Sequence, residues 1–322
     1  RRLFIIIIII PSTAFHNTVY TTKKRTKEME SPNIHIISQD ETVVPAKISS
    51  RENAYDDFHR QGYLILPNVL NPTQIQQLKE AIDKQSRNAK GHGGGGGKSK
   101  RKMRHAMFKR VFEEHPKLCL DVFQNEIVLP VVRGLLRCCG SPRGHNDNSL
   151  EAHIIHNNAF RVDPGMRGQA PMWHTDDPPV LLTHNGRPLS DNIRIAPLVL
   201  TCMYFLNDLN TPEDGGTRII EGSHRFGCHC TDEEAWKHPQ AFVQCPAGSV
   251  LIFSAHTWHK GAAVADTAPN PRYVFQATYG RRLVGHKHDT IMNYVLPSKV
   301  QKQLKTEEDK KLMGFLQGGA YS

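Results

Sequence analysis

Strand-like segments crowd the second half of this 322-residue chain, and they constrain the fold more than any other feature. The segments read EAHIIHNNAFRV, PLVLTCMYFL, GTRIIEG, GSVLIFSAH and RYVFQATYG, and all of them follow residue 150. Gly, Pro, Asn or Asp residues separate them, as is typical of strands joined by turns. Helical patterns come first and strands afterwards. This order predicts an α+β protein whose main body is a β-sandwich or a barrel.

The first half of the chain carries helical patterns and one short strand. RENAYDDFHRQG predicts a helix that ends at Gly62, and YLILPNVL predicts a short buried strand. Asn71 and Pro72 are a favourable start for an amphipathic helix that runs to Ser86. KLCLDVFQNEIVLPVVRGLLRCCG predicts further helix, interrupted at Pro130.

Composition divides the chain into a leader, one folded domain and a tail. Residues 1–46 are low in complexity, and we expect a disordered or leader segment there. The folded domain is expected over residues 47–290, with a flexible, basic, glycine-rich insertion at 89–104. Residues 291–322 are expected to form a helical tail, with a charged surface helix over 297–315.

The net charge of +10 does not by itself indicate a nucleic-acid partner. Much of it lies in Lys23–Lys27 and Lys98–Arg110, two segments that read as solvated rather than as a patch on a folded face. GHGGGGGKSK approaches a phosphate-binding loop, but His92 stands where that motif needs its first glycine. We therefore expect no nucleic-acid partner, and nothing indicates an obligate protein partner.

Cysteine usage and hydropathy bear on location. The chain has seven cysteines and no CxxC motif, a pattern typical of reduced thiols in an intracellular protein. The apolar run LFIIIIII after Arg1 and Arg2 is well short of the ~20 residues that span a bilayer. We expect a cytoplasmic protein without a membrane segment.

The stretch PMWHTDDPPV places a histidine and a carboxylate at metal-binding spacing. Residues i and i+2 of an extended strand project to the same side, so His174 and Asp176 can share one ion. A second His-x-Asp begins at His145, but its loop composition has no strand to hold it. GSVLIFSAHTWHKGAA offers a third ligand, and the spacing leaves His256 and His259 both open.

Basic and aromatic residues near these motifs suggest how ligands would be held. Arg272 follows the third motif and could pair with a carboxylate-bearing cosubstrate. Arg161 is a weaker candidate for contact with an acidic substrate. Trp173 and Trp258 are expected to pack around the metal pocket. Two further histidines are expected at the surface: His153 and His156.

Four ordered motifs resemble those of the phytanoyl-CoA dioxygenase family of Fe(II)- and 2-oxoglutarate-dependent oxygenases. They are WHTDD, EDGGTRIIEGSHR, GSVLIFSAHTWHKGAA and NPRYVFQATY, and FHRQGYLILPNVL resembles the family's opening helix and strand. The resemblance spans roughly residues 50–285. It implies a double-stranded β-helix core (a jelly roll, cupin-like) flanked by helices. Glu221 departs from the family pattern, which has proline in that turn.

The resemblance also assigns roles to individual residues. The implied metal ligands are His174, Asp176 and His259. It implies that Arg272 binds the distal carboxylate of 2-oxoglutarate and that Tyr204 lines the cosubstrate pocket, with Thr201 as a weaker candidate there.

The activity implied is oxidation of a small organic molecule. Fe(II), 2-oxoglutarate and O2 are the implied cofactors, with ascorbate as a candidate reductant. The default reaction is hydroxylation of an unactivated C–H bond, coupled to decarboxylation of 2-oxoglutarate to succinate. A non-catalytic jelly-roll protein that binds a metal or ligand is the alternative. The motifs do not select a substrate.

Overall fold

A computed structural model of the chain describes most of the predicted domain. The described residues are 43–49, 53–88, 105–137, 152–166, 170–177, 182–183, 187–190, 192–288 and 294–315. Three predicted features lie outside them: most of the leader, the glycine-rich insertion at 89–104 and the loop that carries His145.

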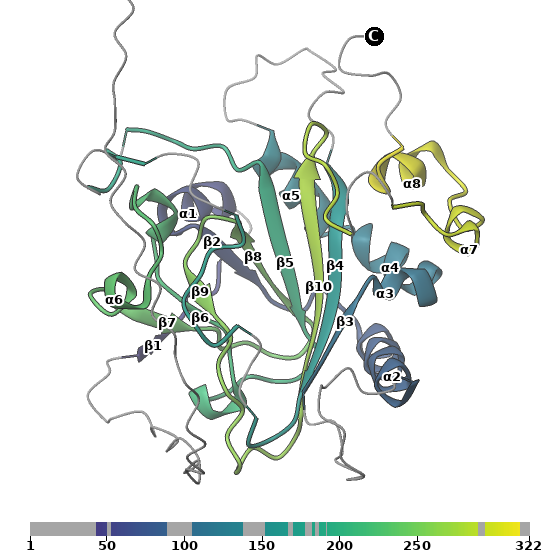
Figure 1. Ribbon diagram of the computed structural model, residues 1–322, viewed down its shortest axis with the longest axis horizontal. Coiled ribbons are helices and arrows are strands. Elements are labelled where there is room, and N and C mark those ends of the chain that lie inside the picture. The colour runs from purple at the N-terminus through teal and green to yellow at the C-terminus, as the bar shows by residue number, and fades with distance from the viewer. Residues whose placement is uncertain are drawn as a thin grey trace, which may run out of the picture. The chain divides into compact units, whose positions relative to one another are not determined.

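Two β-sheets form the body of the protein (Figure 1). The larger sheet has six antiparallel strands, which in spatial order are β2 (Tyr63–Leu66), β8 (Ser249–Ser254), β5 (Val199–Phe205), β10 (Arg272–Arg281), β4 (Ala152–Val162) and β3 (His105–Lys109). The smaller sheet has four strands, which are β1 (Val43–Pro45), β7 (Gln240–Phe242), β6 (Arg218–Ile219) and β9 (His259–Lys260). The predicted α+β class is confirmed.

Alternating side chains of the large sheet supply two separate cores. One face of the sheet packs against the small sheet through Tyr63, Phe205 and Phe253 on one side and Ile219 and Val243 on the other. Because successive residues of a strand point to opposite faces, Leu64, Tyr204 and Phe275 face the other way. The two faces of the large sheet therefore carry different sets of buried side chains.

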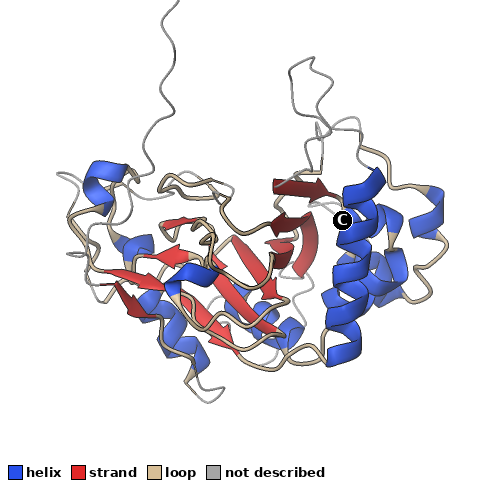
Figure 2. Cartoon of the chain, turned by 90° about the horizontal axis from the view of Figure 1, so that it is seen from below, coloured by secondary structure: helices blue, strands red, loops and turns tan. Residues whose placement is uncertain are grey.

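Helices cover the outer face of the large sheet (Figure 2). The helices that contribute to this core are α2 (Pro72–Asn88), α3 (Val111–Glu114), α4 (Pro116–Phe123), α5 (Val128–Leu136), α7 (Ser298–Gln301) and α8 (Glu307–Leu312). The break between α4 and α5 falls near Asn125, whose side chain accepts from the amides of Ile127 and Val128. The expected interruption at Pro130 is wrong, since proline in a first helical turn costs no hydrogen bond.

Gly62 ends the first helix, as the sequence predicts. Helix α1 (Ala54–Gln61) stops there in the left-handed region at φ 83°, and the Gly62 amide donates to the carbonyl of Phe58. The strand β2 follows at once and is fully buried, which confirms the predicted short strand. The remaining short helices are α6 (Asp232–Ala235) and two 3₁₀ turns, η3 (Pro212–Asp214) and η4 (Ser223–Arg225).

Both ends of the described chain differ from expectation. Strand β1 lies inside the segment expected to be unstructured, because it pairs in parallel with the edge strand β7. The tail forms two short helices, α7 and α8, instead of one surface helix. Val300, Leu304 and Leu312 from this segment are buried in the helix-side core, so the tail is packed against the domain.

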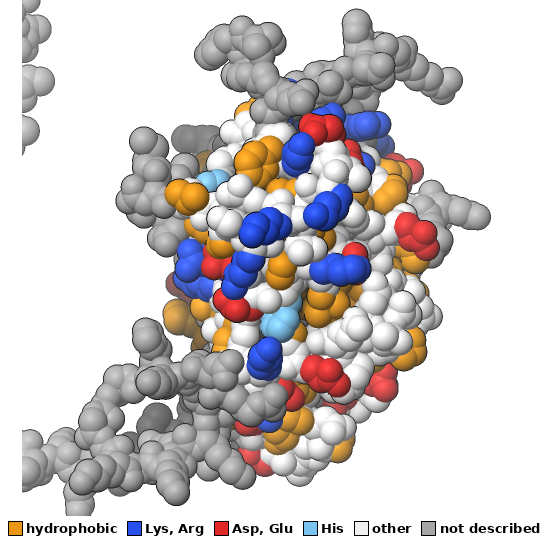
Figure 3. All heavy atoms as spheres, turned by 90° about the vertical axis from the view of Figure 1, so that its right-hand side faces the viewer, with side chains coloured by type: hydrophobic (Ala, Val, Ile, Leu, Met, Phe, Trp, Pro, Cys, Tyr) orange, Lys and Arg blue, Asp and Glu red, His pale blue; other side chains and the backbone are white. Residues whose placement is uncertain are grey.

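Charge on the helical face is mixed rather than uniformly basic. Figure 3 shows Lys and Arg side chains interspersed with Asp and Glu over this side of the molecule. Three ion pairs link such residues: Lys117–Asp121, Lys299–Glu114 and Lys310–Glu307. Among the described helices, none has the length and apolar character needed to cross a bilayer.

Candidate metal centre and cosubstrate pocket

Backbone pairing brings His174 and His259 together although 85 positions separate them in the sequence. The amide of each residue donates to the carbonyl of the other at 3.0 Å, which makes them an antiparallel bridge pair. Residues opposed in this way carry their side chains on the same face. The imidazole centroids are accordingly only 4.2 Å apart. The sheet geometry itself therefore positions two of the three predicted ligands.

The tautomer of each imidazole follows from its backbone partner. Nδ1 of His174 lies 3.0 Å from the carbonyl oxygen of Met172, and Nδ1 of His259 lies 2.9 Å from that of Thr257. A carbonyl oxygen can only accept, so Nδ1 carries the proton and Nε2 keeps its lone pair. Burial lowers the pKa of His259, against the opposing effect of Asp176, which favours the neutral ring that a metal requires.

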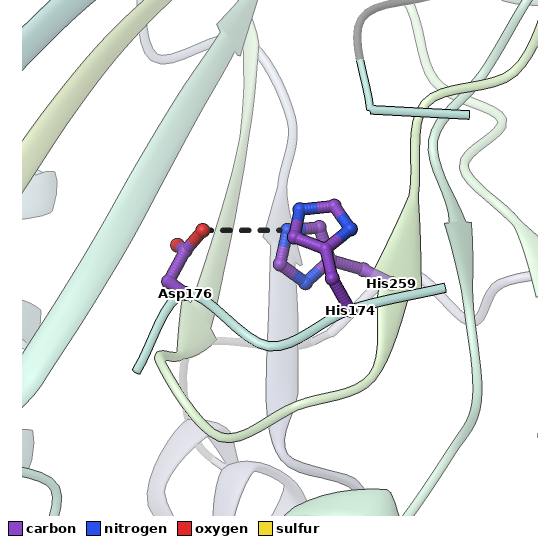
Figure 4. A group of neighbouring side chains, drawn as sticks. All are labelled: His174, Asp176 and His259. Carbon is purple, nitrogen blue, oxygen red and sulfur yellow. Dashed lines mark ion pairs between the residues drawn. The ribbon is translucent and has the colours of Figure 1, made fainter. Parts of the chain in front are cut away.

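Asp176 completes the cluster. Its Oδ1 lies 3.6 Å from Nε2 of His259, and its Oδ2 accepts a 2.7 Å hydrogen bond from the hydroxyl of Thr201 on β5. The ligand atoms of His174, Asp176 and His259 all lie within 4.8 Å of one another, and Figure 4 shows the three side chains converging. Two imidazoles and one carboxylate are the donor set of non-haem Fe(II) sites. These side chains fit that ion.

A cavity of about 310 Å³ opens beside this cluster, between the two sheets. The pairing register of the strands arranges the residues that line this cavity in rows across the large sheet. Thr278 of β10 lies opposite both Thr201 and His156, and Gln276 lies opposite both Met203 and Asn158. The first of these rows carries the Thr201 bond to Asp176, so it marks the level of the metal cluster.

Arg272 lies at the other end of the same cavity. It begins β10, six positions before Thr278, and its side chain is buried. Its guanidinium donates to the carbonyl oxygens of Gly215 and Ala262, while Nε has no hydrogen-bond partner in the described part of the chain. Burial lowers the pKa of Arg272 to about 10, so it stays charged at neutral pH. No carboxylate among the described residues lies within ion-pair distance of it, and an anionic ligand would supply one.

Tyr204 does not lie where the resemblance implies. Its side chain is fully buried on the helix-facing side of β5, where its hydroxyl lies 3.5 Å from the carbonyl oxygen of Val122. The neighbouring residues Thr201 and Met203 occupy the cavity side, as the two-residue period of a strand requires. The expectation for Tyr204 is off by one position along the strand. Thr201, expected only as a weak cosubstrate contact, bonds a cluster residue instead.

The structure separates the other candidates. His256, the alternative to His259, lies in the turn before β9 and does not join the cluster. Arg161 forms ion pairs with Asp83 and Asp163 on the helix side, away from the cavity. Trp173 and Trp258 are buried together in a small core next to the site, as expected.

The expected surface position of His153 and His156 is wrong. His153 is buried, and His156 lines the cavity. The register of β4 against β10 shifts between Thr278 and Tyr279, so that Ile155 bulges out of the pairing. Bulges often re-aim a side chain beside a functional site. Here the bulge turns His156 toward the cavity although Ile154, two residues earlier, faces the helices.

Six polar residues of the cavity lining were not predicted from the sequence to lie there: His156, Asn158, Thr217, Gln276, Thr278 and Lys287. A period-two pattern links His156, Asn158 and Phe160 in HIIHNNAFRV and could have shown that they share one face of the strand. The bulge, which no sequence signal marks, hides where that face begins.

Solved structures with this architecture support the jelly-roll fold. HygX from Streptomyces hygroscopicus, solved with nickel and 2-oxoglutarate, is 14% identical with a TM-score of 0.54, and the match covers 75% of this chain and 90% of HygX. The 2-oxoglutarate-dependent carbocyclase SnoK from nogalamycin biosynthesis is 18% identical with a TM-score of 0.51, covering 76% of this chain and 89% of SnoK. The predicted double-stranded β-helix core is confirmed.

The sequence profile of the phytanoyl-CoA dioxygenase family matches residues 58–269. The chain belongs to this family, and it is an Fe(II)- and 2-oxoglutarate-dependent enzyme. No curated protein sequence matches it. The resemblance inferred from the four motifs is thus confirmed, together with Fe(II) and 2-oxoglutarate as expected cofactors.

Proposed function

We propose that this enzyme hydroxylates an unactivated C–H bond of a small organic molecule. The substrate, 2-oxoglutarate and O2 would be converted to the hydroxylated product, succinate and CO2. One observation carries the proposal: the cavity is lined both by a metal-binding cluster and by a buried arginine that has no carboxylate partner among the described residues. That arrangement suits a cosubstrate with a carboxylate at its far end.

The proposal gives each side chain a defined task. His174 and His259 would hold Fe(II) through Nε2, and Asp176 would hold it through its carboxylate. Bound Fe(II) supplies the redox chemistry with O2 that side chains alone lack. Thr201 orients the Asp176 carboxylate, so it is a positioning residue.

Arg272 holds the distal carboxylate of 2-oxoglutarate in the proposed complex. Burial strengthens this charge pair and excludes water from the far end of the cavity. The carbonyl oxygens of Gly215 and Ala262 fix the guanidinium in place before the ligand arrives.

Succinate formation from 2-oxoglutarate in the presence of Fe(II) and O2 tests the proposal. We expect His174→Ala and Asp176→Ala to abolish it. His145→Ala removes the other His-x-Asp histidine and should leave it unchanged. A protein that binds metal and 2-oxoglutarate but forms no succinate, even with a broad extract of small molecules, would instead support the non-catalytic alternative.

Location and partners complete the proposal. All five cysteines among the described residues are free thiols, which supports a cytoplasmic setting. We propose that the enzyme acts without an obligate protein partner, since the cluster and the cavity are both built from this chain.

A further inference from the structure

We propose that the substrate carries a carboxylate and a hydrogen-bond donor. The carboxylate binds at a basic corner where His156 and Lys287 line the cavity and the exposed Lys109 lies at its edge, and the side chain of Asn158 accepts the hydrogen bond from the donor. This inference rests on the proposed function and names the substrate class for the same site.

Register places the basic corner beside the metal cluster and far from Arg272. His156 lies opposite Thr278 in the row that contains Thr201, the residue bonded to Asp176. The backbone amide of Lys287 donates to the carbonyl of Ile155, which holds Lys287 against the same end of β4. A molecule bound at this corner would lie next to the metal cluster, at the end of the cavity opposite Arg272.

Two ammonium groups and two carboxylates lie around this corner. In the proposed complex Asp176 would bind the metal and Asp177 pairs with Lys287, so Lys109 is the charge left for a ligand to meet. Lys109 lies on the edge strand β3, opposite Asn158, and has no carboxylate partner among the described residues. Lys287 forms an ion pair with Asp177. Burial is the main cause that lowers the pKa of His156; Lys109 lowers it further, Asp176 opposes this, and the charge of Lys287 adds a smaller lowering effect.

Two buried polar atoms in this corner have no hydrogen-bond partner among the residues that the structure describes. They are Nδ1 of His156 and Oδ1 of Asn158, and Asn158 is only 6% exposed. Leaving such an atom unsatisfied costs about 1–3 kcal/mol. Oδ1 of Asn158 needs a donor, and 2-oxoglutarate at neutral pH offers only acceptors. A hydroxyl or amino group of the substrate would satisfy it.

A purely apolar substrate does not match this corner. It would leave both buried atoms unsatisfied. The apolar part of the lining, formed by Met107, Phe160 and Val274, lies further along the sheet toward Arg272. A compact hydroxy- or amino-carboxylate fits a cavity of about 310 Å³, which is at the small end of ligand pockets.

Binding of matched ligand pairs tests the inference without turnover. The protein is loaded with Ni(II) and saturating 2-oxoglutarate, and their binding is measured first by calorimetry. A panel of small hydroxycarboxylates is then titrated, each beside its primary amide and its phosphate-ester analogue, with affinity followed by ligand-observed NMR. We expect carboxylates to bind about tenfold or more tightly than their amides, a difference of about 1.4 kcal/mol, and more tightly than the phosphates.

Substitutions of the two lysines test whether the preference for carboxylates arises at this corner. Lys109→Met and Lys287→Met should each weaken the carboxylates about tenfold and leave the amides and the affinity for 2-oxoglutarate unchanged. Lys117→Met on the helical face is the matched control and should change nothing. Four results would each overturn the inference. They are equal binding of carboxylates and amides, tighter binding of the phosphates, no binding of either carboxylates or amides, and unchanged carboxylate affinity in Lys109→Met. Failure to bind Ni(II) and 2-oxoglutarate would instead count against the proposed function.

Discussion

Replacing Thr201 by valine removes one hydrogen bond from the metal cluster and changes little else. The Thr201 hydroxyl donates to Oδ2 of Asp176 at 2.7 Å, and valine preserves the branched shape of the buried side chain. A hydrogen bond to a charged group contributes about 1.5–3 kcal/mol. Loss of a partner that orients a metal ligand typically costs about 10–100-fold in metal affinity.

The exposure of Asp176 sets where in that range the effect should fall. Its side chain is 25% exposed, so water partly replaces the lost hydroxyl. We therefore expect Thr201→Val to weaken Fe(II) binding by about 10–30-fold, or about 1.4–2 kcal/mol. Anaerobic calorimetric titration with Fe(II) measures this directly.

Thr278→Val is the matched control. Thr278 is equally buried on the neighbouring strand and lies opposite Thr201, but it has no hydrogen bond to a cluster residue. Its replacement should leave Fe(II) affinity within about twofold of the unmodified protein. The reasoning is refuted if Thr201→Val keeps full metal affinity, or if the two valine variants lose it equally.

Three further predictions concern the cosubstrate, a strand face and pH. Arg272→Met should raise the KM for 2-oxoglutarate at least ~100-fold while Fe(II) affinity stays unchanged in calorimetry, since a buried charge pair would be lost. Tyr204→Phe should leave that KM unchanged in a succinate assay, because its side chain lies on the helix side of β5; a KM raised about tenfold would return Tyr204 to the pocket. Burial lowers the pKa of His288 from 6.5 to about 3. Below pH 6.5 the unfolded state therefore binds a proton that the folded state does not, and the free energy of unfolding falls as the pH is lowered. His288→Phe should make the urea midpoint less dependent on pH between about 6.5 and 4, and an unchanged dependence would contradict this.

Local patterns predicted much of the fold. The strand segments after residue 150 and the helix that ends at Gly62 are present as expected. The errors occur where the structure of a segment depends on pairing with residues far away in the sequence. No local signal marks β1 as a strand, because its partner β7 lies about 200 positions away. The C-terminal tail was mispredicted for the same reason. Its apolar residues are buried only because they contact the helix-side core, which is built from distant parts of the chain.

The metal cluster was easier to predict than the rest of the site. Its three residues depend on short-range spacing and on a pair of strands that the motifs identify. The open choice between His256 and His259 is decided by the backbone bridge to His174, which the sequence does not reveal.

The cavity walls were harder to predict for two physical reasons. A one-residue shift in a strand moves a side chain to the opposite face, which displaced Tyr204. A bulge at Ile155 turned His156 inward.

A crystal structure of the protein loaded anaerobically with Fe(II) and 2-oxoglutarate tests the central claim most directly. The account predicts one ion within about 2 Å of Nε2 of both His174 and His259 and of an Asp176 oxygen. It also predicts the far carboxylate of 2-oxoglutarate on the Arg272 guanidinium. An ion bound by other residues, or a 2-oxoglutarate that leaves Arg272 without a carboxylate, would contradict it.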